Sequence, residues 1–206
     1  MRRLLLALTV TCLTLLAATT AGAGVYTIIP SPSADMWDLD HYKAYRWGIN
    51  WATPPSQEIT NVVLTFKGIY DWTYEPDVLH TTLLDDPLAG VSVITDNQAS
   101  GNYFAGQGVT VGAWSDPYGD YAHRINLSYD FASLGLLPTF QTFAADGSFG
   151  FGFDPDCHYF NSGLELKIYT ADVPTPTDPV PEPATLTMLG LGMAGLGYYR
   201  RRQGRK

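Results

Sequence analysis

Between residues 24 and 172, apolar and polar side chains alternate along short runs, and this period of two constrains the fold more than any other feature. Such a period is typical of β-strands with one buried face. The runs that carry this or a weaker strand signal are 45–49, 61–66, 78–84, 91–95, 109–113, 124–131, 148–153 and 164–169. Clusters of Gly, Pro, Asp and Asn between them predict turns. We therefore expect an all-β domain over 24–172, an antiparallel β-sandwich of jelly-roll type, with one helical turn near 132–136.

The expected domain contains a single cysteine, Cys157, which excludes an internal disulfide. A lone thiol is either buried or, in an oxidising compartment, available to cross-link two molecules. Catalysis by Cys157 with His158 is disfavoured, because adjacent strand residues point to opposite faces. A zinc site built on this pair lacks a second cysteine and the usual ligand spacing.

The first 23 residues have the three parts of a secretory signal peptide. Arg2 and Arg3 precede an apolar run over 4–16, and small residues follow at 21–23. We expect signal peptidase to cleave before Gly24, with cleavage after residue 21 as the alternative. An uncleaved anchor helix is the other interpretation of this segment.

The C-terminal segment begins with a proline-rich linker and ends in a cluster of arginines. Residues 173–183 hold five of the 14 prolines, which favours an extended spacer. Residues 184–199 are uncharged and apolar, and as a helix they would span about 24 Å of a hydrocarbon core of about 30 Å. The stop-transfer cluster is Arg200, Arg201 and Arg202. These features predict a single transmembrane helix that holds the preceding residues outside the cytoplasm; a buried core helix is the alternative.

The order of these parts resembles a known sorting signal. Val180, Pro181, Glu182 and Pro183, then a Gly-rich apolar segment and terminal arginines, resemble the PEP-CTERM signal over 180–206. The same tail is also classified as an ice-binding protein C-terminal domain. The resemblance implies recognition and cleavage near this motif by an exosortase, and a Gram-negative host that makes exopolysaccharide. It further implies a transient anchor in the inner membrane, then a place at the cell surface or in the extracellular matrix of a biofilm. It implies no activity for the domain itself.

Charge separates the domain from its two basic ends. The chain has a formal charge of −8, but residues 24–173 hold eighteen acidic residues against five basic ones, a net charge of −13. A body this acidic argues against nucleic acid as a partner.

Two acidic segments are candidates for a calcium site. Asp154 and Asp156 follow one expected strand, and Asp38 and Asp40 lie near the start of the domain. First and last strands often neighbour one another in sandwiches, so the two segments can converge, and carboxylate oxygens are the ligands that Ca²⁺ takes. The alternative is a pair of Asp-rich turns. Calcium is the one cofactor that the sequence suggests.

Aromatic residues provide the better indication of function. Trp51, Trp72 and Trp114 fall at expected loops or strand ends, where exposed rings can stack on sugars; burial in the core is the alternative. The sequence contains no hydrolase, metalloprotease or nucleotide-binding motif, so we expect no enzyme.

These observations predict a non-catalytic exported module that binds polysaccharide. A cryptic extracellular glycan hydrolase is one alternative, and it requires two carboxylates that converge in a cleft. An ice-binding protein is another, suggested only by the name given to the tail; it would need regular ranks of threonine, and the domain has no Thr-x-Thr repeat.

Overall fold

The computed structural model describes residues 22–74, 76–97 and 101–174 together with 188, 190–194, 200–201 and 203–204. The chain divides into two compact units, Met1–Asp172 and Val173–Lys206. The signal peptide predicted over 1–23 lies outside the described residues except for its last two positions. The predicted sorting residues Val180, Pro181, Glu182 and Pro183 also lie outside them.

The C-terminal unit is described only in part. Residues 188, 190–194, 200–201 and 203 are helical, so two of the three stop-transfer arginines are in helical conformation, and Arg202 lies outside the description. No helix among the described residues has both the length and the apolar character needed to cross a membrane. The transmembrane helix predicted over 184–199 therefore stays a prediction.

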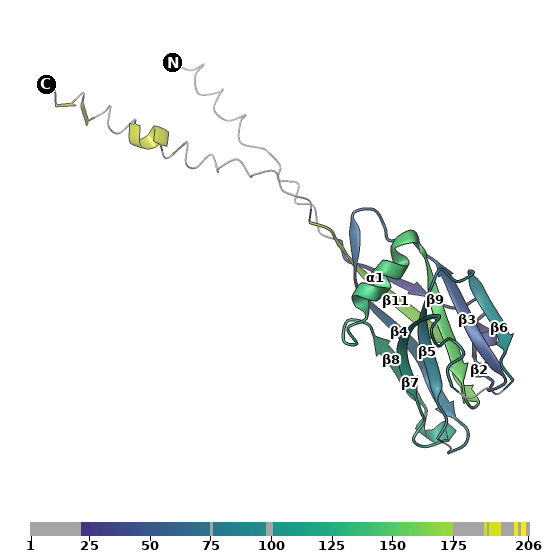
Figure 1. Ribbon diagram of the computed structural model, residues 1–206. Coiled ribbons are helices and arrows are strands. Elements are labelled where there is room, and N and C mark those ends of the chain that lie inside the picture. Colours follow the sequence, from purple (N-terminus) through teal and green to yellow (C-terminus); the bar gives the residue numbers. More distant parts are fainter. Residues whose placement is uncertain are drawn as a thin grey trace. The chain divides into compact units, whose positions relative to one another are not determined.

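The first unit consists mainly of two antiparallel sheets. One sheet has the order β1 (Gly24–Ile28), β11 (Leu164–Asp172), β4 (Gln57–Asp71), β10 (Tyr159–Phe160) and β2 (Asp38–Leu39), with β8 (Ile125–Asp130) also paired to β4. The other has the order β6 (Gly90–Thr95), β3 (Lys43–Asn50), β9 (Ser148–Pro155), β5 (Leu79–Asp85) and β7 (Gly108–Trp114) (Figure 1). The helical elements are η1 (Ser33–Met36), η2 (Tyr121–His123), α1 (Leu137–Phe143) and η3 (Ala144–Asp146).

The two sheets share one hydrophobic core. Alternate residues of β4 are fully buried at Val62, Leu64 and Phe66, as the period of two predicts. The ring of Phe66 meets that of Phe153 in β9 edge to face, with centroids 5.2 Å apart, and this contact joins the sheets. The all-β prediction is confirmed, and the arrangement is consistent with a sandwich.

Strand β9 departs from the half-buried pattern, because both of its faces are covered. Its phenylalanines enter the main core, while a Cβ added at Gly152 would lie 2.5 Å from the ring of Phe104. Phe104 is fully buried with Ala44 and Leu84 in a second, smaller cluster. Glycine on the outer face of β9 thus makes room for the connection before β7.

All eight expected strands are present, but the sequence reading misses β1, β2 and β10. The last two have only two residues each, too few to show a period. The helical turn expected near 132–136 is a turn that leads into α1, which has proline at the start of its first turn. Phe140 anchors α1 by packing edge to face on Phe131 at 5.5 Å.

Candidate functional site

The short strand β10 brings together segments from opposite ends of the domain. Tyr159 pairs with Leu39 of β2 on one side and with Asp71 of β4 on the other. The backbone N–H of Asn161 donates to the carbonyl oxygen of Trp37 at 2.9 Å. Residues 37–41 and 158–161 therefore meet at this edge, whereas Asp154 and Asp156 lie beside Asp96 and His80 instead.

An aromatic groove of about 330 Å³ lies along this edge. Its aromatic residues are Trp37, Tyr70, Tyr121 and Phe160, and its other lining residues are Asp38, Gly68, Arg124, Asn161 and Ser162. They come from β2, β4, β10, η2 and the connections beside them. The groove combines ring faces with polar groups, which is the usual make-up of a small-molecule or saccharide site.

Ring contacts hold the aromatic residues of the groove in place. Tyr70 stacks on Phe160 with centroids 5.5 Å apart, and it meets Tyr121 edge to face at 5.3 Å. The guanidinium of Arg124 lies 4.2 Å from the centre of the Tyr121 ring. Trp37 and Tyr121 nevertheless stay 48% and 60% exposed. The groove thus offers two open ring surfaces on a base that is already ordered, which lowers the entropic cost of binding.

Polar side chains fix the backbone around the groove. The amide of Asn161 donates to the carbonyl oxygen of Met36 at 2.7 Å and accepts from the N–H of Gly163 at 2.9 Å. The hydroxyl of Ser162 donates to the carbonyl oxygen of Lys67 at 2.9 Å. The segment that bears Trp37 is thereby tied to the segment that follows β10.

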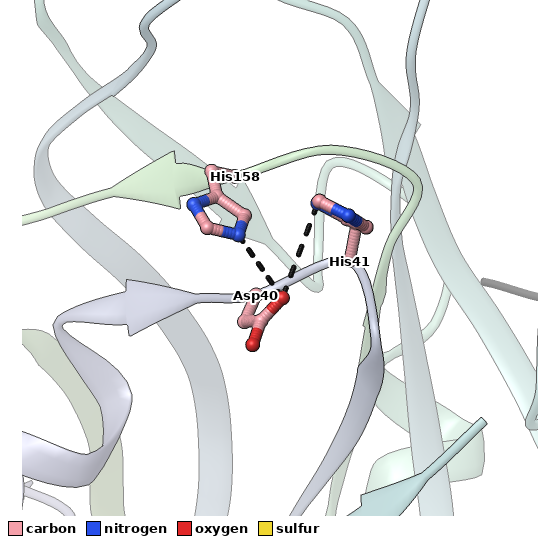
Figure 2. A group of neighbouring side chains, drawn as sticks. All are labelled: Asp40, His41 and His158. Carbon is pink, nitrogen blue, oxygen red and sulfur yellow. Dashed lines mark hydrogen bonds and ion pairs between the residues drawn. The ribbon is translucent and has the colours of Figure 1, made fainter. Parts of the chain in front are cut away.

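A histidine–aspartate cluster, defined here as Asp40, His41 and His158, adjoins the groove (Figure 2). His158 Nε2 lies 3.0 Å from Asp40 Oδ1, and His41 Nδ1 lies 3.9 Å from the same oxygen. The two imidazole rings are 4.7 Å apart. On its other side His158 faces the groove residue Asp38, with Nδ1 and Oδ1 3.9 Å apart. His158 is thus flanked by two carboxylates.

The carboxylate of Asp40 is stabilised in its charged form. Partial burial opposes its ionisation, but hydrogen bonds from the N–H of Tyr42 and from His158 outweigh that effect and lower its pKa. Lys43 Nζ adds a contact at 3.4 Å to Oδ2. The hydroxyl of Tyr45 accepts from the N–H of Asp40 and donates to the carbonyl oxygen of Asp38, and burial raises its pKa to about 12. The neutral Tyr45 therefore braces the turn between β2 and β3.

A second acidic group, the buried carboxyl group, is defined here as Asp96, Asp154 and Asp156. Asp154 is only 1% exposed, and its Oδ2 accepts from the N–H of Tyr103. Burial, and then a hydrogen bond to and repulsion from Asp96, raise the pKa of Asp154 to about 7. Burial also raises the pKa of Asp156, although His80 at 4.0 Å opposes it. Asp154 therefore lies beside other carboxyl groups, and Asp156 lies beside His80 as well.

Cys157 belongs to a third group, with Asp71 and Asp77, whose donor atoms all lie within 4.8 Å of one another. The thiol is half-buried, 3.8 Å from the hydroxyl of Thr73. Burial, with the charge of Asp71 beside it, raises the thiol pKa to about 11. Whether Cys157 cross-links two molecules stays a prediction.

The four residues named for calcium do not form one group among the described residues. Asp38 and Asp40 face His158, whereas Asp154 and Asp156 belong to the buried carboxyl group. Calcium at these residues stays a prediction. Asp156 and His158 belong to different groups although they are two positions apart, because the chain bends between β9 and β10.

The three tryptophans named for sugar contact are absent from the lining of the groove. Trp51 is half-buried against Tyr26 at 5.3 Å, and Trp114 is half-buried against Tyr159 at 5.6 Å. Trp72 is 66% exposed. The aromatic residues that do line the groove were missed, although Tyr70 and Phe160 stand at outward positions of their strands, where an aromatic side chain is itself a signal.

Comparison with known proteins identifies the tail. Residues 179–203 match the family described as the PEP-CTERM protein-sorting motif. The match confirms the resemblance drawn from the sequence, and the chain carries this sorting signal. No curated protein and no solved structure matches the chain.

Proposed function

We propose that this PEP-CTERM protein is an exported, exosortase-sorted protein whose β domain binds polysaccharide without catalysis. The sorting motif supports export and handling by an exosortase, with a transient stay in the inner membrane. The proposed destination is the cell surface or the polysaccharide matrix of a Gram-negative host. The observation that carries the binding function is the aromatic groove.

Strand order supports a jelly-roll form for this domain. With β2, β6 and β10 set aside, the sheets have the orders β1-β11-β4-β8 and β3-β9-β5-β7. Successive strands of the chain then lie in opposite sheets, apart from the neighbours β5 and β7. Two Greek keys produce this arrangement in jelly rolls, a fold common among lectin domains.

The chemistry of the groove suits a sugar chain. The apolar face of a pyranose ring can cover the exposed ring surfaces of Trp37 and Tyr121 and remove them from water. Asp38 and Arg124 at the groove can accept and donate hydrogen bonds to hydroxyls. The net charge of −13 over residues 24–173 repels polyanions, so we propose a neutral glycan.

The lining of the groove also favours binding over hydrolysis. Asp38 is the only carboxylate among the described residues that line it. Glycoside hydrolysis generally needs two carboxyl groups about 5–10 Å apart across the bond. A binding role without turnover is therefore the simpler proposal for this groove.

Native gel electrophoresis through embedded polysaccharides tests the proposal. The full-length protein in mild detergent should be retarded by at least one neutral polysaccharide of a panel that includes bacterial exopolysaccharides. The double substitution W37A/Y121A should weaken this binding at least about tenfold, while W72A, an exposed tryptophan outside the groove lining, should not. Equal retardation of W37A/Y121A and the unchanged protein, or no retardation at all, would contradict it.

A further inference from the structure

We propose that Asp40, His41 and His158 form a binding site for a divalent transition-metal ion of the zinc class. The site is separate from the sugar chemistry proposed for the groove, and it uses ring nitrogens that the groove does not need. Figure 2 shows the three side chains directed toward one another from the connection after β2 and the residue before β10.

The spacing of the donor atoms is close to what a tetrahedral ion requires. Ligand atoms about 2.1 Å from zinc lie about 3.4 Å from one another. The two measured pairs bracket that value, at 3.0 Å for His158 Nε2 and 3.9 Å for His41 Nδ1, each to Asp40 Oδ1. All three donor atoms lie within 4.8 Å of one another, so shifts on the order of 1 Å would complete three ligand positions.

The donor set selects the class of metal. Two imidazoles and one carboxylate suit zinc, copper, nickel or iron, whereas calcium and magnesium take sets made of oxygen atoms. The three side chains remain 22–30% exposed, so a fourth position would be open to water or to a ligand. An open fourth position distinguishes this arrangement from a closed structural site.

The surroundings of His158 resemble those of a metal-bound histidine. Nε2 faces Asp40, the proposed ligand, while Nδ1 faces the carboxylate of Asp38 at 3.9 Å. Histidines bound to metal usually donate their other ring N–H to a carboxylate, which fixes the ring and raises its basicity. A metal bound at Nε2 requires that this nitrogen carry no proton, so the ring N–H would lie on Nδ1, the nitrogen that faces Asp38.

The partners of Asp40 leave it free to take this role. Its Oδ2 faces Lys43 at 3.4 Å, while Oδ1 is the atom directed at both histidines. The N–H of Tyr42 also donates to Oδ1, at 3.1 Å, and so holds that oxygen in position. One carboxylate oxygen can therefore bind the ion while the other keeps its contact with lysine.

The group of Asp71, Asp77 and Cys157 is the competing location. It offers a thiol and two carboxylates, and the Asp77 Oδ2 atom is buried with no hydrogen-bond partner among the described residues. Asp71 in that group is buried, so an ion there would have to leave water. All three side chains of the histidine–aspartate cluster are open to solvent, and two of them offer imidazole nitrogens, so we assign the site to this cluster.

Calorimetric titration of the tag-free, full-length protein with zinc chloride tests the assignment. We expect saturable binding of one ion per chain with micromolar or tighter affinity and a raised melting temperature, because an ion that binds only the folded state stabilises it. H41Q and H158Q should each weaken zinc binding at least about tenfold. The matched controls H80Q and H123Q change histidines that also lie beside an aspartate, and they should bind like the unchanged protein.

Cobalt as a spectroscopic substitute separates the two candidate locations. The cobalt-loaded protein should show a low-symmetry visible spectrum without a thiolate charge-transfer band, and C157S should leave that spectrum unchanged. Melting curves in chelator confirm that each variant is folded before metal is added. Absence of saturable zinc binding, binding unaffected by H41Q and H158Q, or binding lost in C157S would each overturn the proposal.

Discussion

Asp154 and His158 are four positions apart in the sequence, yet they lie in regions of opposite electrostatic character. In the buried carboxyl group, Asp154 is almost inaccessible and faces Asp96, and its pKa rises to about 7. In the histidine–aspartate cluster, Asp40 is partly exposed and faces His158 and Lys43, and its pKa falls below its ordinary value.

The difference shows that the number of acidic residues does not identify a cation site. Asp154 and Asp156 come from one acidic segment of the sequence, and Asp40 comes from the other. In one, burial and like charge favour the protonated form; in the other, donors and cations favour the carboxylate. The surroundings of each aspartate decide what it can bind, and the two regions should therefore respond differently to pH, reagents and substitution.

The largest expected effect is a pH dependence of stability caused by Asp154. Its folded pKa of about 7 lies above the ordinary 3.8, so the folded state keeps a proton that the unfolded chain releases first. Its contribution to the unfolding free energy is therefore full below pH 4 and declines as the pH rises to about 7, by up to about 4 kcal/mol. Urea unfolding from pH 4 to 8 should show this slope. D154N keeps an acceptor for the N–H of Tyr103 and should remove the part of the slope that Asp154 causes. An unchanged slope in D154N would contradict the raised pKa of Asp154.

Cys157 lies between Asp156 and His158 in the sequence, and its reactivity tests whether the thiol behaves as a buried or as an exposed group. Burial raises its pKa from 9.0 to about 11, so near neutral pH the thiolate population should be about 100-fold below that of an ordinary thiol. Alkylation by iodoacetamide should be slower than in the urea-unfolded chain by at least that factor. Equal rates in the folded and unfolded states would place the thiol on the exposed side and favour cross-linking of two molecules.

D40N should have a smaller effect with the opposite pH dependence. The Asp40 carboxylate accepts hydrogen bonds from Tyr42 and His158, so its loss should cost about 1 kcal/mol at pH 7. Because its pKa is lowered on folding, this contribution is present above pH 4 and disappears as the pH falls below the folded pKa. The difference between D40N and the unchanged protein should thus vanish in acid. A stability difference between D40N and the unchanged protein that grows as the pH falls would contradict the lowered pKa of Asp40.

Y121A should have the smallest effect on stability. Tyr121 is exposed, and its two ring contacts, with Arg124 and with Tyr70, contribute about 0.5 kcal/mol each. Chemical unfolding should therefore place Y121A within about 1 kcal/mol of the unchanged protein, even though polysaccharide binding weakens. A loss of several kcal/mol would mean that the Tyr121 ring is required for the stability of the fold, which would contradict a role confined to ligand binding.

Most of the strands could be predicted because the alternation of apolar and polar side chains can be read within each run of residues. The alternation over 61–66 and 164–169 marks β4 and β11, and both buried faces follow it. Short strands such as β2 and β10 have no period to read; β10 pairs with the long strand β4, and β2 pairs with β10 in turn. The helix α1 was missed because its seven residues are too few to show a helical period and because proline stands at its start.

The groove could not be predicted from the sequence in the same way. It joins Trp37 with Tyr121, which are far apart in the chain, through the pairing of β10 with β2 and β4. Sequence position at loops suggested Trp51 and Trp114, but both pack on the core. The first and last strands, β1 and β11, are neighbours as expected, but the aspartates named for calcium do not converge, because Asp154 and Asp156 precede the bend between β9 and β10.

The central claim is that this domain binds glycans through the aromatic groove. It is tested most directly by NMR, with backbone amide shifts followed while an oligosaccharide of a polysaccharide that the protein binds is titrated in. The account predicts shifts concentrated at Gly68, Tyr121, Arg124, Asn161 and Ser162, with little change elsewhere. Shifts concentrated instead around Trp51, Trp72 or Trp114, or a glycan-bound protein with no shifts along the groove, would contradict it.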